Sequence, residues 1–137
     1  MKYLAIDLGE SKIGIATSDT KGIVAQPHSV ISRKSDTKAI SMISHVCEEE
    51  RIELIVLGIP LSANEERQDR YRSFARKVEE STGLKVKFWD ETFSTKQAQN
   101  MVAFSDRDPG RKATVQHRDD VAAAIILQEF LDNEALT

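Results

Sequence analysis

The order of apolar and polar positions predicts a small sheet at the start of the chain. Residues 2–8 (KYLAIDL) and 13–18 (IGIATS) are short, rich in strand-forming residues and separated by the turn sequence GESK, so we expect them to pair as a hairpin. A third strand is expected within residues 23–31 (IVAQPHSVI), where Pro27 indicates an edge strand or a bulge. Three consecutive antiparallel strands therefore form the first predicted unit.

Helices and strands then alternate along the chain. Apolar residues recur every three or four positions in two segments, and apolar or alternating runs follow each of them. The expected elements are a helix over 36–51 with Ser35 or Asp36 as its N-cap, a central strand over 53–58, a helix over 64–82 with Gly83 as its C-cap, and a strand over 84–89. Because parallel crossovers are right-handed, these units place helices on both faces of the sheet.

The last part of the chain is predicted to contain two helices and a loop. Ser94 is expected to cap a short helix, and residues 105–117 (SDRDPGRKATVQH) show no period and contain Pro, Gly and many charges, as loops do. A wide apolar face from Val121 to Leu131 predicts a final, mostly buried helix. The whole pattern predicts an α/β fold in one domain, residues 1–137, with a five-stranded mixed sheet of three antiparallel meander strands followed by βα units.

Composition and charge narrow the class of protein. Among 137 residues, 19 basic side chains stand against 22 acidic ones, for a net charge of −3. This balance excludes binding of nucleic acid through bulk positive charge but allows a local basic face. The single cysteine, Cys47, excludes an internal disulfide, and no apolar run approaches the ~20 residues of a membrane span. We therefore expect a cytoplasmic protein without membrane contact.

Acidic residues at three points along the chain are candidates for chemistry. Asp7 lies in an apolar strand, where a carboxylate costs several kcal/mol unless it is paired, hydrogen-bonded or metal-bound; the alternative is an edge position facing water. Glu91 follows a predicted strand, where ligands bind in open α/β sheets, although Asp90 is equally suited. Asp119 and Asp120 open the last helix, where acidic residues also simply complement the helix dipole.

The predicted topology brings these carboxylates toward one edge of the sheet. Converging carboxylates repel one another unless divalent cations neutralise them, and Mg²⁺ accepts one or two carboxylates together with water and phosphate oxygens. Two such ions about 3.5–4 Å apart activate water and stabilise the leaving oxygen in phosphodiester cleavage. His28, His45 and His117 lack metal-ligand spacing, which disfavours zinc, and the sequence has no P-loop pattern.

Basic residues gather in two places. The predicted loop and the residues after it carry Arg107, Arg111, Lys112 and Arg118. These suit phosphate contacts, although a charged, solvated loop explains them equally well because acidic residues are interspersed. The predicted helix over 64–82 carries Arg67, Arg70, Arg72 and Arg76. These mix with acidic residues, and we interpret them mainly as a solvated face.

Four blocks of sequence carry a family resemblance. They are AIDLGESKIGIATSD at 5–19, IVLGIPLS at 55–62, WDETFST at 89–95 and HRDDVAAAIILQEFLD at 117–132. In order and spacing they resemble the YqgF family, also called RuvX-like, of bacterial proteins proposed to resolve Holliday junctions or to process pre-16S rRNA. The resemblance covers nearly the whole chain and implies an RNase H-like fold with metal-dependent nuclease activity.

The resemblance also implies roles for individual residues. The acidic triad of the family maps onto Asp7, Glu91 and Asp119, which are the implied catalytic residues and the implied ligands of Mg²⁺ or Mn²⁺. By resemblance, Gly9 and Lys12 shape the first hairpin, and Ser94 and Thr95 match the hydroxyl pair after the third block. Together with the basic residues in and after the predicted loop, these four are the predicted substrate-binding residues. Thr92 and Ser11 depart from the family by standing where a basic residue is common, which removes candidate phosphate contacts and leaves the triad intact.

These observations predict a hydrolase of the two-metal type that cleaves structured nucleic acid. We favour 5′-end processing of pre-16S rRNA in ribosome biogenesis, with an rRNA precursor or a ribosomal precursor particle as partner. One alternative is a Holliday junction resolvase acting on branched DNA in recombination and repair, which needs two symmetric sites and hence a homodimer. Another is a nucleic-acid-binding factor without catalysis. A sugar kinase or actin-like ATPase, whose Asp-x-Gly hairpin is similar, needs two such domains.

Overall fold

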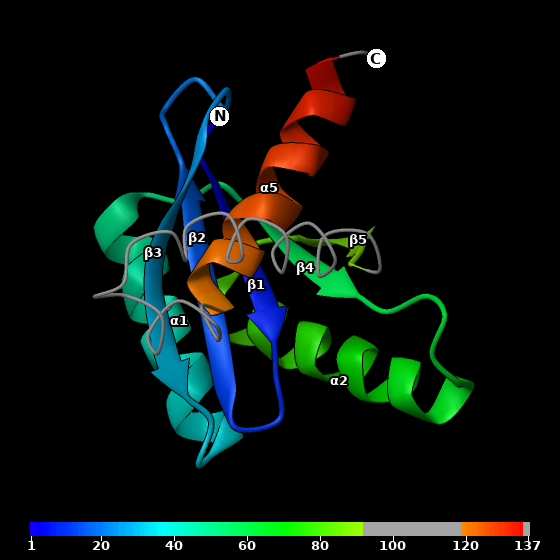
Figure 1. Ribbon diagram of the computed structural model, residues 1–137. Coiled ribbons are helices and arrows are strands. Elements are labelled where there is room, and N and C mark those ends of the chain that lie inside the picture. The colour runs from blue at the N-terminus through cyan, green and yellow to red at the C-terminus, as the bar shows by residue number, and fades with distance from the viewer. Residues whose placement is uncertain (92–118, 136–137) are drawn as a thin grey trace, which may run out of the picture.

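The computed structural model describes residues 1–91 and 119–135 and has a mixed α/β architecture (Figure 1). Its elements are β1 (Tyr3–Leu8), β2 (Lys12–Ser18), β3 (Ala25–Ser32), α1 (Asp36–Glu50), β4 (Leu54–Ile59), α2 (Glu65–Thr82), β5 (Val86–Asp90) and α5 (Asp119–Ala135). The strand order is β3-β2-β1-β4-β5. β2 pairs antiparallel with β1 and β3, and β4 pairs parallel with β1 and β5. The predicted five-stranded mixed sheet is confirmed.

Successive side chains of each strand point to opposite faces of the sheet, and a separate core covers each face. On β1, Leu4 and Ile6 pack with α1 and α2, whereas Ala5 between them packs with α5. Figure 1 shows these layers, with α5 crossing one face and α1 and α2 covering the other. Helices on both faces, as predicted, explain why the central strands are apolar on both sides.

Glycines on the α5 face of the sheet let this helix lie against the strands. A Cβ at Gly14 of β2 would lie 2.0 Å from the carbonyl oxygen of Asp119. A Cβ at Gly58 of β4 would lie 2.7 Å from Cδ1 of Ile126 and 3.1 Å from Oε2 of Glu91. Gly14 therefore requires glycine for close approach of backbone rather than for a turn, whereas at Gly58 the near atoms belong to side chains.

Gly14→Ala is expected to displace α5, because the added methyl group meets backbone atoms that cannot turn away. We expect a loss of about 1–3 kcal/mol in unfolding free energy and a changed near-ultraviolet spectrum, since the sole tryptophan, Trp89, packs edge-on against Phe130 of α5 at 5.9 Å. Gly83→Ala is the control: it sits in open space at the C-cap of α2 with φ of 73°. It should lower stability without altering the tryptophan signal; identical spectra for the two variants would contradict the close contact.

Two element boundaries differ from the sequence prediction for local reasons. β3 begins at Ala25 instead of residue 23, and within it Pro27 pairs with Ala16 beside a register shift in β2. Because β3 is an edge strand, both the edge and the bulge expected at Pro27 are confirmed. β5 begins at Val86 instead of residue 84. The Leu84 N–H donates to the Thr82 hydroxyl at the end of α2 at 3.1 Å, so residue 84 still belongs to the turn that leaves the helix.

The helix caps follow the expected chemistry. Ser35, rather than Asp36, is the N-cap of α1, with its Oγ accepting from the Lys38 N–H at 3.3 Å. Gly83 caps α2 in the left-handed region, as predicted. The predicted short helix after Ser94 and the predicted loop over 105–117 lie outside the described residues. Within the described ranges, no helix has the length and apolar character needed to cross a membrane.

Candidate active site

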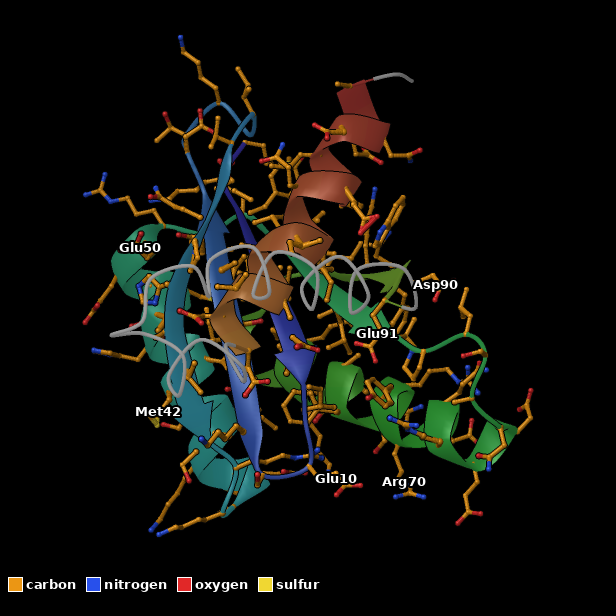
Figure 2. The ribbon with its side chains drawn as sticks, in the orientation of Figure 1. Glu10, Met42, Glu50, Arg70, Asp90 and Glu91 are labelled. Carbon is orange, nitrogen blue, oxygen red and sulfur yellow. The ribbon has the colours of Figure 1, made fainter. Side chains whose placement is uncertain are left out.

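Asp7 and Glu91 lie together at one edge of the sheet. Asp7, next to the end of β1, lies opposite Gly14 on the face that α5 covers. Glu91 directly follows β5, and its N–H donates to the carbonyl of Ile59 at the end of β4 at 3.1 Å; Figure 2 labels it there. Because β1, β4 and β5 are parallel, their carboxyl ends meet at this edge, where ligand sites form in open α/β sheets.

The two carboxyl groups form a hydrogen bond in a largely buried setting. Glu91 is 8% exposed. Burial, followed by the charges of Glu91 and Asp119, raises the pKa of Asp7 to about 8. The hydrogen bond raises the pKa of Asp7 and opposes a rise in that of Glu91, as expected when a protonated Asp7 donates to an ionised Glu91. At neutral pH Asp7 therefore keeps its proton.

Glu91 is also held by two residues of α2. The single proton of the Tyr71 hydroxyl faces two acceptors, the carbonyl of Leu8 at 3.1 Å and the carboxylate of Glu91. Arg67, one turn earlier, donates to the same hydroxyl. Burial raises the pKa of Glu91, while the hydrogen bond with Asp7, the charge of Arg67 and the Tyr71 bond act against that rise. The cation and the hydroxyl thus favour an ionised Glu91.

The two acidic residues that open α5 have different surroundings. The charge of Asp119 contributes to the raised pKa of Asp7, and the Asp119 backbone packs against Gly14. The Asp120 side chain is buried, and its Oδ1 accepts from the Val121 N–H at 3.0 Å. The structure therefore places Asp119 close to Asp7, which is in turn hydrogen-bonded to Glu91.

The donor chemistry of the acidic pair fits a divalent cation with oxygen ligands. Mg²⁺ takes one or two carboxylates with water and phosphate oxygens, and Asp7 and Glu91 offer two carboxylates whose repulsion a cation relieves. Within residues 1–91 and 119–135, no group of three or more His, Cys, Asp or Glu residues is placed to hold one ion together. Binding of a cation therefore means replacing the proton that Asp7 and Glu91 share.

The predicted substrate-binding residues fall in two groups. Gly9 and Lys12 form the β1–β2 turn, where the Gly9 N–H donates to the Lys12 carbonyl at 2.9 Å. Ser11 lies in the same turn, and its carbonyl accepts from the Arg33 N–H. The others, Ser94, Thr95, Arg107, Arg111, Lys112 and Arg118, lie outside the described residues, as does Thr92.

Sequence reasoning did not include Arg67 and Tyr71 in the site. Tyr71 fits the apolar face of the helix over 64–82, and Arg67 fits its charged face. Their spacing of four residues, which places two side chains one above the other on a helix, is the signal that links them. What that spacing does not reveal is that both face Glu91, because the approach of α2 to the end of β5 is a tertiary feature.

Comparison with known proteins gives consistent results. The sequence pattern of RuvX, described as a Holliday junction resolvase, matches residues 1–133. A protein of Syntrophomonas wolfei named "Putative pre-16S rRNA nuclease" is 39% identical, covering 99% of this chain and 97% of its own. A protein of the same name from Fusobacterium nucleatum is 37% identical, covering 96% of each.

Among solved structures, RuvC of T. thermophilus in complex with a Holliday junction substrate has the same fold. Its TM-score is 0.60 at 14% sequence identity, over 98% of this chain and 96% of that one. This likeness confirms the expected RNase H-like fold of the RuvC type. With the match over residues 1–133 and close relatives over nearly the full length, the chain belongs to the RuvX family, also called YqgF.

Proposed function

We propose that this protein is a metal-dependent endonuclease that hydrolyses phosphodiester bonds in the 5′-end processing of pre-16S rRNA. The observation that carries the proposal is the buried pair of Asp7 and Glu91, with Asp119 nearby, at the carboxyl ends of parallel strands. Burying carboxylates close together lowers the stability of a fold, and such clusters with shifted pKa values are typical of functional sites. The names of the relatives favour RNA as the substrate.

In the proposed mechanism, Asp7 and Glu91 hold Mg²⁺ or Mn²⁺, and Asp119 adds negative charge beside them. When bound, the metal activates water and stabilises the leaving oxygen, in the two-ion manner if a second ion joins. The chain itself supplies the anchoring: Tyr71 and Arg67 orient Glu91 and keep it ionised. Asp7 would hold the cation as a carboxylate, so its proton would pass to water when the metal binds.

The wider setting is part of the proposal. We propose that residues 1–137 work as one nuclease domain in the cytoplasm, on an rRNA precursor or a ribosomal precursor particle. Gly9 and Lys12, together with the basic and hydroxyl residues between positions 94 and 118, are proposed to contact the substrate.

A cleavage assay tests this proposal directly. An rRNA fragment extended at its 5′ end and a four-way DNA junction are incubated with the protein in Mg²⁺, Mn²⁺ or chelator. We expect cleavage of the RNA in either metal and none in chelator. Salt-dependent RNA binding without cleavage in any divalent metal would instead identify a binding factor.

Holliday junction resolution is the second candidate, because the family is described as a resolvase. Resolution requires two sites acting on symmetric strands, so this version needs a homodimer. Cutting of the junction by a dimeric protein would favour it, and a strict monomer in light scattering would count against it.

Tyr71→Phe is expected to reduce cleavage about tenfold, because Glu91 loses a hydrogen bond of roughly 1.5 kcal/mol. The buried carbonyl of Leu8 loses its donor as well, so a stability loss of about 1 kcal/mol should accompany the change. Tyr3→Phe is the matched control at the other tyrosine, which packs against Phe130. Equal cleavage rates for the two variants would remove Tyr71 from the proposed mechanism.

A further inference from the structure

A small pocket lies between the β1–β2 turn and the first half of α2. Its volume is about 130 Å³, and its lining includes three arginines, Arg33, Arg67 and Arg70, together with Glu10 and Tyr71. Sites that enclose whole small molecules measure about 300–1,000 Å³, so this pocket suits a single small group. Arg33 is paired with Asp36, and Arg67 and Arg70 against Glu10 still leave the lining positively charged, which suits an anion.

The pocket shares a wall with the acidic pair. Tyr71 lines the pocket, and its hydroxyl hydrogen-bonds with Glu91 and accepts a bond from Arg67. The charge of Arg67 also acts on Glu91. The Tyr71 side chain thus separates an anion in the pocket from the carboxylates that are proposed to act on the scissile phosphate.

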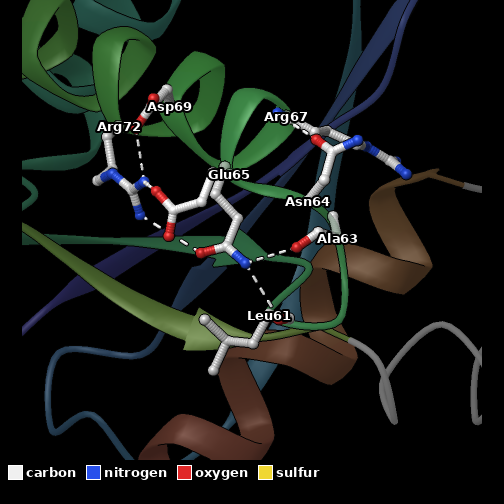
Figure 3. Close-up of polar contacts among 8 residues, drawn as sticks. Leu61, Ala63, Asn64, Glu65, Arg67, Asp69 and Arg72 are labelled. Atoms are coloured by element: carbon white, nitrogen blue, oxygen red, sulfur yellow. Dashed lines mark hydrogen bonds and ion pairs between the residues drawn. The ribbon is translucent and has the colours of Figure 1, made fainter.

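The arginines of the pocket and of α2 differ in whether a carboxylate neutralises their charge. Arg33 donates to Asp36 at 2.8 Å and to the Gly9 carbonyl at 2.8 Å. These bonds hold the Arg33 side chain in place at the edge of the pocket and neutralise its charge. Arg72, on the same helix, pairs with Asp69 at 2.6 Å and Glu65 at 3.6 Å (Figure 3).

Among the residues that the structure describes, no carboxylate forms an ion pair with Arg70. Arg70 is exposed. Figure 2 shows it projecting to the same side of the molecule as Glu10 of the β1–β2 turn. Arg70 lies in the first two turns of α2. The helix starts at a defined point because Asn64 caps it, accepting from the Arg67 N–H at 2.8 Å (Figure 3).

We infer that this pocket binds a backbone phosphate of the nucleic-acid strand next to the phosphate that is cleaved, with Arg67 and Arg70 as its cationic contacts. The inference rests on the proposed function. The negative charge of the acidic cluster, carried by Glu91 and Asp119 beside a protonated Asp7, repels a polyanion, so a strand needs cationic contacts close by to bind at the site. A guanidinium group matches phosphate oxygens with two parallel hydrogen bonds. Glu10, at the rim, opposes the binding.

The test measures binding apart from cleavage. A labelled single-stranded RNA is titrated in chelator at several salt concentrations against wild type, Arg70→Gln, Glu10→Gln and Arg76→Gln. Arg76 is the matched control, because it is exposed on the same helix and lies nine residues, half a turn around the axis, from Arg67. All three positions are exposed, so thermal melting should be nearly unchanged.

Arg70→Gln and Glu10→Gln are expected to change the affinity for RNA in opposite directions. Arg70→Gln should weaken binding about tenfold and lower the slope of log affinity against log salt by about 0.7, the value for one phosphate contact on a single strand. Glu10→Gln should tighten binding a few-fold, and Arg76→Gln should match wild type. Equal effects of Arg70→Gln and Arg76→Gln, or no RNA binding by wild type, would overturn the inference.

Cleavage in Mg²⁺, measured in parallel, separates this inference from the proposed function. If wild type cuts RNA while Arg70→Gln keeps the full salt slope, the pocket assignment is wrong and the nuclease stands. If Arg70→Gln lowers the slope while wild type never cuts, the pocket assignment stands and the nuclease is wrong.

Discussion

Asp7→Asn is expected to lower the rate of RNA cleavage in Mg²⁺ by about a thousandfold or more while the protein stays folded. The change removes one of two proposed metal ligands, and the metal supplies several kcal/mol of transition-state stabilisation. The fold should tolerate it, since the asparagine amide donates to Glu91 as the protonated Asp7 carboxyl does. In chelator above pH 8 the variant should even be more stable, because it has no buried charge to ionise.

Single-turnover cleavage of the 5′-extended rRNA fragment measures the effect. Asp19→Asn is the matched control: it makes the same chemical change at an exposed turn, where the side chain accepts from the N–H groups of Ile23 and Val24. It should cleave at the wild-type rate. If Asp7→Asn also cleaves at that rate, the carboxylate pair is not the reactive centre.

In chelator, the unfolding free energy of the wild-type protein is expected to fall as the pH rises from about 4 to about 8. Burial raises the pKa of Asp7 from 3.8 to about 8, so in this window the unfolded chain has already released the proton that the folded one retains. Unfolding then releases a proton, and stability falls by at most about 1.4 kcal/mol per pH unit. Below pH 4 both states are protonated, and above pH 8 both are ionised.

Urea unfolding of wild type and Asp7→Asn across this range isolates the contribution of Asp7. Other groups titrate too: the lowered pKa values of Asp19 and Asp36 act in the opposite direction, and they cancel in the difference between the two proteins. The gap should open steadily between pH 4 and 8. Mg²⁺ at one hundred times its dissociation constant should narrow the gap by stabilising only the wild type, by about 2.7 kcal/mol. Parallel curves would refute a shared proton.

The fold was predictable because its strands and helices carry local signals. The residues of β4 are apolar on both faces, as expected for a strand between two layers of helices. Helix α2 begins after Asn64 and ends at Gly83, and both residue types are common caps. The start of β5 was harder, because Leu84 has the composition of a strand residue but its N–H donates to the Thr82 hydroxyl in the turn after α2. Strand composition alone does not reveal that bond.

The acidic positions of the site were predictable, whereas their supports were not. Asp7 stands out because a carboxylate inside an apolar strand needs a partner, and the ends of parallel strands place Glu91 near it. That Asp7 and Glu91 share a proton depends on how deeply both are buried. Arg67 and Arg70 read as surface charge because sequence spacing does not reveal which side of α2 meets the β1–β2 turn.

The contact between Gly14 and the start of α5 links the order of synthesis to the order of assembly. β1 and β2 leave the ribosome early, but the face that carries Asp7 stays bare, and the cluster lacks Asp119, until the last helix emerges. The charge that Asp119 adds beside Asp7, and with it part of the rise in the pKa of Asp7, is therefore acquired only when α5 docks on the sheet. The acidic cluster is thus completed by tertiary assembly and not by the hairpin that carries its first member.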